Sequence, residues 1–171
     1  GIKEELTKKT YPVNEKYKNA ILCMGRIETR KNQLNLIKAI NNTSYSLYIH
    51  GKPSPNNMAY YQQCLDEAAP NVHIAGWLEE QELYTAYSNA KVHVLPSYFE
   101  TTGLSSLEAA VMGCNIVVTD LGDTRDYFHD DAWYCNPDDP SSIKAAIDAA
   151  YNAPYDENFR RRILQEYTWE R

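Results

Sequence analysis

Short apolar runs alternate along the chain with segments in which apolar residues recur at helical spacing. Strands buried on both faces read as continuous apolar runs. These runs predict strands at residues 20–24, 45–49, 72–75, 91–95, 115–119 and 132–135. The helical segments are 32–40, 58–69, 80–89, 103–112, a helix that begins at Pro140 behind a capping Asp139, and 159–167. In the helix over 103–112, Leu104, Leu107 and Val111 are expected to face inward.

This alternation predicts an α/β fold, a Rossmann-like parallel β-sheet of about six strands with helices on both faces. Residues 20–171 are expected to form that domain. Residues 1–19 are polar and rich in lysine, and are interpreted as a leader or linker segment. Ligands of such sheets bind beyond the carboxyl ends of the strands. The residues that directly follow each strand are therefore the candidates for function.

The composition of the chain limits the kinds of ligand and location that can be expected for it. The 171 residues are the size of one compact domain. A net charge of −6 gives little support for a nucleic-acid surface, which needs a basic face. The sequence shows neither a secretory signal nor an apolar run as long as a membrane helix, so a cytoplasmic location is expected. The four cysteines lack metal-ligand spacing and are expected to be reduced and packed: Cys23, Cys64, Cys114 and Cys135.

A group of cations follows the first predicted strand. Gly25 ends the strand, and Arg26 and Lys31 come before the next helix. A helix N-terminus attracts anions, and an arginine can bind two phosphate oxygens. This arrangement would suit a phosphate group. A solvated basic turn is the competing interpretation, and the segment taken alone favours it.

Two glutamates follow the fourth predicted strand. Glu108 lies along the inward stripe of its predicted helix, where a carboxylate is costly unless hydrogen bonds are donated to it. Sugar hydroxyls are suitable donors, and a ribose offers an adjacent pair. Glu100 would face the mouth of the same crevice, and Gly103 would let a ligand approach the backbone. For either acid alone an ordinary exposed position competes with this reading, but the pair favours function.

Other candidates follow the second and third strands. Trp77 and Leu78 could form an apolar shelf for a nucleobase, or Trp77 could pack in the core, and the sequence favours neither. His50 ends a strand beside Gly51 and is a candidate to face the ligand. His93 lies inside an apolar strand and is expected to be a hydrogen-bonded core histidine. No pair of histidines has metal-ligand spacing, so no metal site is expected.

Over residues 20–171 the chain resembles the C-terminal, nucleotide-sugar-binding domain of retaining glycosyltransferases with the GT-B architecture. The most specific feature is Glu100, seven intervening residues and Glu108, with Gly103 and Ala109 in place. The remaining matches are Gly25-Arg26 with Lys31, the run from Asn71 to Gly76, Val94 to Ser97, and Tyr167 to Trp169. Thr102 stands where the family often has an aromatic residue, and Gly122-Asp123 where it often has two glycines.

The resemblance implies a role for each matching residue. Arg26 and Lys31 would bind the donor diphosphate and stabilise the leaving group, and Glu100 would contact the donor sugar near the reacting carbon. Glu108 would hold the ribose hydroxyls. The other residues assigned to donor binding are Gly25, His50, the base-flanking Trp77 and Leu78, and Thr102, Gly103 and Leu104 at the start of the helix.

The resemblance also implies a reaction. A hexose would pass from a UDP-, GDP- or ADP-sugar to a glycan, lipid or small molecule with retention, without a metal or other cofactor, as in polysaccharide biosynthesis. The partners would be the nucleotide sugar and an acceptor-binding N-terminal domain that lies outside this chain. The isolated domain is then expected to bind nucleotide weakly and to transfer nothing. A peripheral membrane position of the full-length enzyme stays open.

Three other functions compete with this interpretation. A nucleotide-sugar epimerase would share the diphosphate site. A non-catalytic module on the same fold would bind a protein partner and no donor. A nicotinamide-dependent dehydrogenase is the weakest candidate, because the glycine fingerprint G-x-G-x-x-G is missing.

Overall fold

The computed structural model of the chain describes residue 6 and residues 10–100 and 104–167. Its centre is a six-stranded sheet with the order β3-β2-β1-β4-β5-β6, and every pairing is parallel. The strands are β1 (Ile21–Met24), β2 (Leu47–His50), β3 (Val72–Ala75), β4 (Val92–Leu95), β5 (Asn115–Thr119) and β6 (Trp133–Cys135). All six predicted strands are confirmed, with ends that differ by at most two residues. The α/β fold class is therefore confirmed as well.

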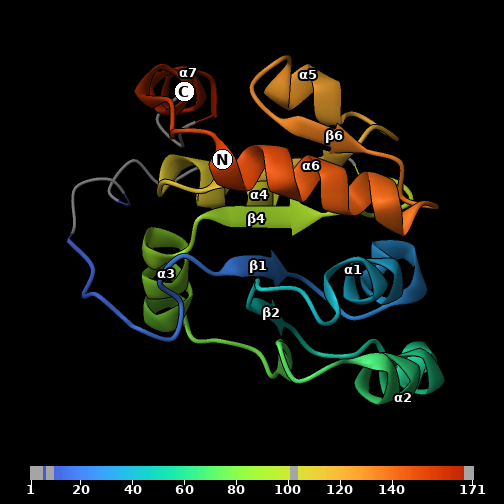
Figure 1. Ribbon diagram of the computed structural model, residues 1–171. Helices are drawn as coiled ribbons and strands as arrows, with labels where there is room; N and C mark the ends of the chain where they lie inside the picture. Colours follow the sequence, from blue (N-terminus) through green and yellow to red (C-terminus); the bar gives the residue numbers. More distant parts are fainter. Residues whose placement is uncertain (1–5, 7–9, 101–103, 168–171) are drawn as a thin grey trace.

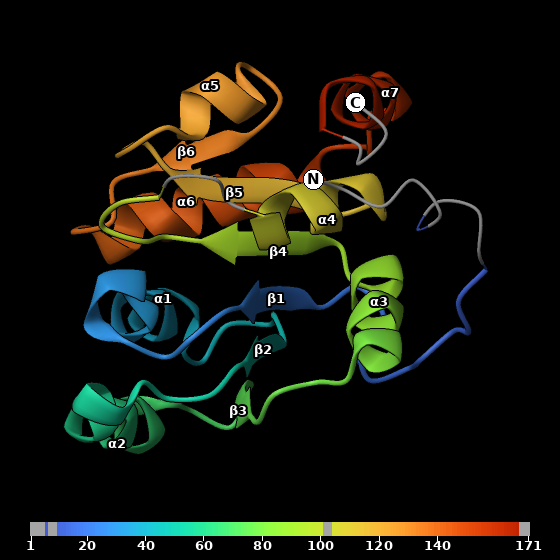
Figure 2. The same cartoon turned by 180° about the vertical axis from the view of Figure 1, so that it is seen from behind.

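Helices cover both faces of the sheet. The helices of eight or more residues are α1 (Gln33–Ile40), α2 (Met58–Glu67), α3 (Glu80–Asn89), α4 (Leu104–Val111), α6 (Pro140–Asn152) and α7 (Glu157–Tyr167). In one layer α1 packs between α2 and α6, and in the other α4 packs between α3 and α7. Figures 1 and 2 show α6 and α4 on opposite sides of β4. This arrangement buries both faces of the central strands, which explains their continuous apolar runs.

The start of α6 is as the sequence predicts. Asp139 is its N-cap, and a side-chain oxygen of Asp139 accepts a hydrogen bond from the backbone N–H of Ser141 at 2.9 Å. Pro140 occupies the first turn, where no backbone N–H is needed. Ile143 and Ile147 then point into the core with no exposed surface.

One α-helix is not predicted from the sequence. The helix α5 (Thr124–Phe128) has only five residues, too few for helical periodicity to be visible. Two short 3-10 turns, η2 (Thr29–Lys31) and η3 (Pro55–Asn57), were also not predicted. Thr124 and Phe128 are buried, so α5 is held by packing against the domain.

Residues 10–19, which we call the strap, belong to the segment expected to be a leader or linker. The backbone N–H of Asn14 donates to Oδ1 of Asn89 on α3 at 3.1 Å, and Nδ2 of Asn89 donates to the carbonyl of Pro12 at 2.9 Å. Tyr17 is only 4% exposed and joins the core. The strap is thus packed against α3 and, through Tyr17, against β2.

The cysteines are as expected. All four are free and buried: Cys23, Cys64, Cys114 and Cys135. Burial raises the pKa of Cys23 to about 12, because the thiolate would lose its hydration. Within the described ranges, the helices are all too short or too polar to cross a lipid bilayer.

His93 is a hydrogen-bonded core histidine, as predicted. Its side chain is fully buried in β4, and its Nε2 accepts a hydrogen bond from the backbone N–H of Met24 at 3.2 Å. Nδ1 therefore carries the proton in the neutral ring, and Ser106 Oγ lies 3.5 Å from it. Burial, with a smaller contribution from the positive charge of Lys31, lowers the pKa of His93 to about 3.

We predict that His93 makes the fold less stable in mild acid. The unfolded chain takes up a proton at this residue below about pH 6.5, whereas the folded chain does not. Between about pH 7.5 and pH 5.5 this difference should remove about 1.4 kcal/mol of the free energy of unfolding. Urea denaturation of the wild type and of His93→Gln at both pH values measures it. The variant should lose less stability on acidification, and equal losses in the two proteins would contradict the prediction.

Candidate functional site

A hollow of about 400 Å³ opens where β1, β2 and β3 end, between those strand ends and helices α3 and α4. The residues that line it are Met24, Gly25, Arg26, His50, Gly51, Lys52, Trp77, Leu78, Leu83, Tyr87, Ser105 and Glu108. Six of these were named as site residues from the sequence: Gly25, Arg26, His50, Trp77, Leu78 and Glu108. The structure therefore brings these residues together at one edge of the sheet.

The floor of the hollow is a close crossing of two backbone segments. A Cβ atom on Gly51, whose φ is +157°, would lie 1.8 Å from the carbonyl oxygen of Gly25. The pairing of β1 and β2 continues past this crossing, because the backbone N–H of Ile27 donates to the carbonyl of Lys52 at 3.0 Å. Arg26 and Lys52 lie on either side of this pairing. Both side chains are exposed and line the hollow.

The opposite wall carries an acid. Glu108 is half-buried on α4, and Tyr84 on α3 donates a long hydrogen bond of 3.5 Å to its Oε2. Burial, together with the negative charge of Glu108, raises the pKa of Tyr84, so its hydroxyl keeps its proton. The carboxylate of Glu108 therefore has a neutral donor on one side and faces the hollow on the other.

The expected inward stripe of α4 is only partly correct. Leu107 and Val111 are 3% and 1% exposed, but Leu104 is 44% exposed. Leu104 is the first residue of the helix, at its loop edge, before the buried part of the helix begins. The inward orientation predicted for Leu104 is therefore wrong.

The structure decides between the two interpretations of Trp77. Its side chain is 59% exposed and lines the hollow, so it is not a core residue. The ammonium of Lys52 lies 5.6 Å from the centre of the indole ring, within cation–π range. The two side chains together form an aromatic and cationic rim on the side of the hollow nearest the loop after β3.

His50 faces the hollow with both ring nitrogens already engaged. Nδ1 lies 3.0 Å from the carbonyl oxygen of Gly76, which can only accept, so Nδ1 carries the proton. Nε2 is then the acceptor for the hydroxyl of Tyr17 at 3.0 Å. Burial lowers the pKa of His50, which favours this neutral form. His50 therefore contributes to the wall through its ring and holds two protein groups.

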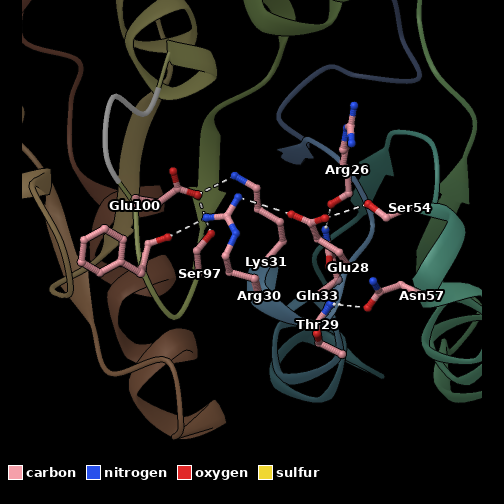
Figure 3. A network of polar contacts seen from close by, with 11 residues as sticks. Arg26, Glu28, Thr29, Arg30, Lys31, Gln33, Ser54, Asn57, Ser97 and Glu100 are labelled. Carbon is pink, nitrogen blue, oxygen red and sulfur yellow. Dashed lines mark hydrogen bonds and ion pairs between the residues drawn. The ribbon is translucent and has the colours of Figure 1, made fainter.

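Lys31 and Glu100 form an ion pair beside the hollow. Lys31 Nζ lies 2.7 Å from Glu100 Oε1, and the hydroxyl of Ser97 donates to the same oxygen at 2.7 Å. The side chains of Lys31 and Glu100 are 16% and 6% exposed. Neither residue lines the hollow among the described residues. Figure 3 shows Lys31 reaching toward Glu100, whereas Arg26 extends in another direction.

The turn that carries Lys31 is joined to the loop that carries Glu100. Arg30 Nη1 donates to the carbonyl of Phe99 at 3.0 Å, and the backbone N–H of Tyr98 donates to the carbonyl of Arg30 at 2.9 Å. On its other side the turn is held by Glu28, which accepts a hydrogen bond from Ser54 at 2.7 Å (Figure 3). That hydrogen bond lowers the pKa of Glu28.

The loop that follows β5 holds the backbone of Glu100. The backbone N–H of Asp123 donates to the carbonyl of Glu100 at 2.9 Å. Gly122 has a φ of +95°, and a Cβ there would lie 2.1 Å from the carbonyl oxygen of Glu100. The pair Gly122-Asp123 stands where the family often has two glycines. At the first of these positions the loop geometry therefore requires a glycine.

Some expectations lie beyond what the structure describes. Thr102 and Gly103 lie outside the described residues, as do the last residues of the segment from Tyr167 to Trp169. Conversely, Lys52, Ser97 and Ser105 are not among the site residues predicted from the sequence. Lys52 directly follows a strand-ending glycine, which is a detectable signal, whereas nothing in the sequence pattern distinguishes the two serines. The described residues hold no group of His, Cys, Asp and Glu side chains arranged for a metal ion.

Comparison with known proteins identifies the family to which the chain belongs. The family model described as glycosyl transferases group 1 matches residues 4–168. A glycogen synthase of Mycobacterium tuberculosis is 24% identical over 162 residues, which are 88% of this chain and 39% of that protein. The chain therefore spans about two fifths of the length of this curated relative.

Solved structures share the fold. HepE of Anabaena, described in complex with UDP-glucose, superposes with a TM-score of 0.84 at 13% identity, over 98% of this chain and 52% of that one. The C-terminal domain of the group 1 glycosyl transferase LpcC from Francisella tularensis superposes with a TM-score of 0.71 at 18% identity, over 96% and 93%. The chain thus shares the α/β fold of these proteins and covers about half of HepE.

We predict that Lys31 and Glu100 are energetically coupled. Lys31→Met leaves a nearly buried carboxylate without its cation and should cost about 2–4 kcal/mol of the free energy of unfolding. Adding Glu100→Gln removes that unpaired charge, so the double variant should be more stable than the two single losses imply, by about 1–3 kcal/mol. Urea denaturation of the four proteins completes the cycle. Strictly additive losses would show that the pair contributes no interaction energy.

We predict that Gly122→Ala displaces the loop that carries Glu100. The added methyl group meets backbone atoms, which cannot rotate away, so the loss in stability should reach about 2 kcal/mol or more. Gly76→Ala is the matched control, because the added Cβ has no atom within 4 Å apart from those of its own residue and its two chain neighbours. It should change stability by about 0.5 kcal/mol or less. Thermal and urea unfolding compare the two variants, and similar losses in both would refute the argument.

Proposed function

The chain belongs to the glycosyl transferases group 1 family, and from that membership we propose that it is the part of a glycosyltransferase that binds the nucleotide-sugar donor. The observation that carries the proposal is the hollow at the carboxyl ends of β1, β2 and β3. It joins the cations of Arg26 and Lys52, the aromatic face of Trp77 and the carboxylate of Glu108. A nucleoside diphosphate presents the matching groups, which are two phosphates, a flat base and a ribose diol.

Each group of the donor would have its own place. The base would lie on Trp77 and Leu78, and the ribose hydroxyls would donate to Glu108. The diphosphate would lie against Gly25, where no side chain blocks approach to the backbone, and against the guanidinium of Arg26. Supporting this assignment, the structurally similar HepE is described in complex with UDP-glucose.

The sugar would extend from the diphosphate toward Lys31 and Glu100. In the proposed reaction, the bond between the anomeric carbon of a hexose and the diphosphate oxygen breaks. The acceptor hydroxyl oxygen forms the new bond with retention of configuration and releases its proton. The departing diphosphate gains negative charge, which Arg26 and Lys31 would stabilise. These two cations would do so without a metal ion.

The complete activity would need more than this chain. The chain spans 39% of the length of the glycogen synthase it matches, and about half of HepE. We propose that an acceptor-binding domain completes the enzyme, and that the present chain binds nucleotide without transferring sugar. A cytoplasmic location and a role in glycan synthesis form part of the same proposal.

We predict that the isolated chain binds at least one of UDP, GDP and ADP. Binding to the folded state should raise its melting temperature in a thermal-shift experiment. Arg26→Ala should weaken that binding by about ten- to a hundred-fold, since a charged hydrogen bond is worth about 1.5–3 kcal/mol. Glu108→Gln should weaken it as well, and isothermal titration calorimetry would measure both.

Arg161→Ala provides the control. Arg161 is exposed on α7, so this variant removes a positive charge without touching the hollow. Its affinity should equal that of the wild type. A folded wild-type chain that binds none of the three nucleotides would refute the proposal and favour a module that binds a protein partner.

A further inference from the structure

The strap, residues 10–19, contacts the wall of the hollow through Tyr17. Tyr17 is 4% exposed, and its ring packs edge-on against Tyr48 on β2 with the ring centres 5.1 Å apart. Its hydroxyl extends past that ring to His50, the last residue of β2. The anchors at Asn14 and Asn89 fix the strap on α3 and so determine where this hydroxyl lies.

Two hydrogen bonds in series connect the strap to the base-side loop. The hydroxyl of Tyr17 donates to His50 Nε2 at 3.0 Å, and His50 Nδ1–H donates to the carbonyl of Gly76 at 3.0 Å. His50 is 4% exposed, so both bonds lie in a protected environment. Because a neutral imidazole has one donor and one acceptor, the two bonds use its full hydrogen-bonding capacity.

The loop that receives this connection carries the proposed base platform. It joins the end of β3 at Ala75 to the start of α3 at Glu80, and it includes Trp77 and Leu78. At its far end the carbonyl of Glu79 accepts a hydrogen bond from Leu83 as α3 begins. At its near end the carbonyl of Gly76 accepts the hydrogen bond from His50, and further along Lys52 lies over the ring of Trp77 and Leu78 packs against the core.

We propose that Tyr17 and His50 are positioning residues for the nucleobase: through them the strap fixes the loop of residues 76–79 and so sets the affinity for the base. The inference rests on the proposed function, since it assumes that a nucleotide occupies the hollow. It adds that residues before the first strand form part of the binding site. On the diphosphate side of the hollow, Gly25 contacts His50 through the backbone, where its N–H donates to the carbonyl of His50 at 3.1 Å. Substitution of the Tyr17 hydroxyl or of the His50 side chain leaves this backbone hydrogen bond in place.

The test compares two ligands that differ by the nucleoside. UDP engages both sides of the hollow, whereas inorganic pyrophosphate engages only the diphosphate side. Tyr17→Phe keeps the ring and removes the hydroxyl. The dissociation constant of UDP, measured by isothermal titration calorimetry, should rise about three- to ten-fold. The inhibition constant of pyrophosphate, measured by competition against UDP, should stay unchanged.

Tyr48→Phe is the matched control. It removes a hydroxyl from the neighbouring tyrosine, whose ring stacks on His73 at 4.6 Å, and leaves both hydrogen bonds of His50 in place. Affinity for both ligands should remain at the wild-type value. If GDP or ADP proves to be the stronger ligand of the wild type, it replaces UDP throughout.

Two variants of His50 test the second bond separately. His50→Asn retains a donor near the position of Nδ1, so it should keep much of the affinity for UDP. His50→Leu has no donor and should weaken UDP at least as much as Tyr17→Phe. Affinity for UDP in the order wild type, His50→Asn, His50→Leu, with pyrophosphate constant, would support the proposal.

The possible results distinguish a failure of this inference from a failure of the proposed function. Unchanged UDP affinity in Tyr17→Phe would overturn this inference and leave the proposed function standing. Equal weakening of UDP and pyrophosphate would also overturn it, because the effect would then be a general loss of structure. A wild-type chain that binds no nucleotide would overturn both.

Discussion

Asn32 ties together three loops at the carboxyl edge of the sheet. Its Nδ2 donates to the carbonyls of Pro96 and Pro137 at 2.8 and 2.7 Å, and its backbone, with φ of 63°, closes the turn η2. Those carbonyls follow β4 and β6, and a buried carbonyl without a partner costs about 1–3 kcal/mol. Asn32 satisfies the carbonyl of Pro96 and shares that of Pro137 with Nδ2 of Asn35, which donates to it at 3.0 Å. Residues 29–31 are thereby held against the loop after β4. The meeting of Lys31 with Glu100 depends on this arrangement.

The ammonium of Lys31 acts beyond its own ion pair. It lies above the carboxyl ends of β1 and β4, and its charge contributes to lowering the pKa of His93 and partly opposes the rise in the pKa of Cys23. The electrostatic field of the site therefore extends into the core below it. In a chain of net charge −6, this edge gathers the cations of Arg26, Lys31 and Lys52.

The sequence predicts what depends on local pattern. Continuous apolar runs identify the strands because the central sheet is covered on both faces, and Asp139 with Pro140 identifies the start of α6 because capping is a local interaction. Contacts between distant loops are not predictable in this way. Lys31 and Glu100 are 69 residues apart, and nothing in either segment specifies that their side chains meet. Tyr17 lies in a polar segment, so only the tertiary fold reveals its burial.

The strand order has a consequence for synthesis on the ribosome. β1 pairs with β2, which follows soon after it, but its other neighbour, β4, is about seventy residues further along the chain. At about 5–20 residues per second, translation takes several seconds to supply that neighbour. During this time the nascent chain presents an unpaired edge of a strand whose four residues, Ile21–Met24, are all buried in the finished domain. Such an edge can pair with other chains, so the nascent chain is prone to aggregation during this interval.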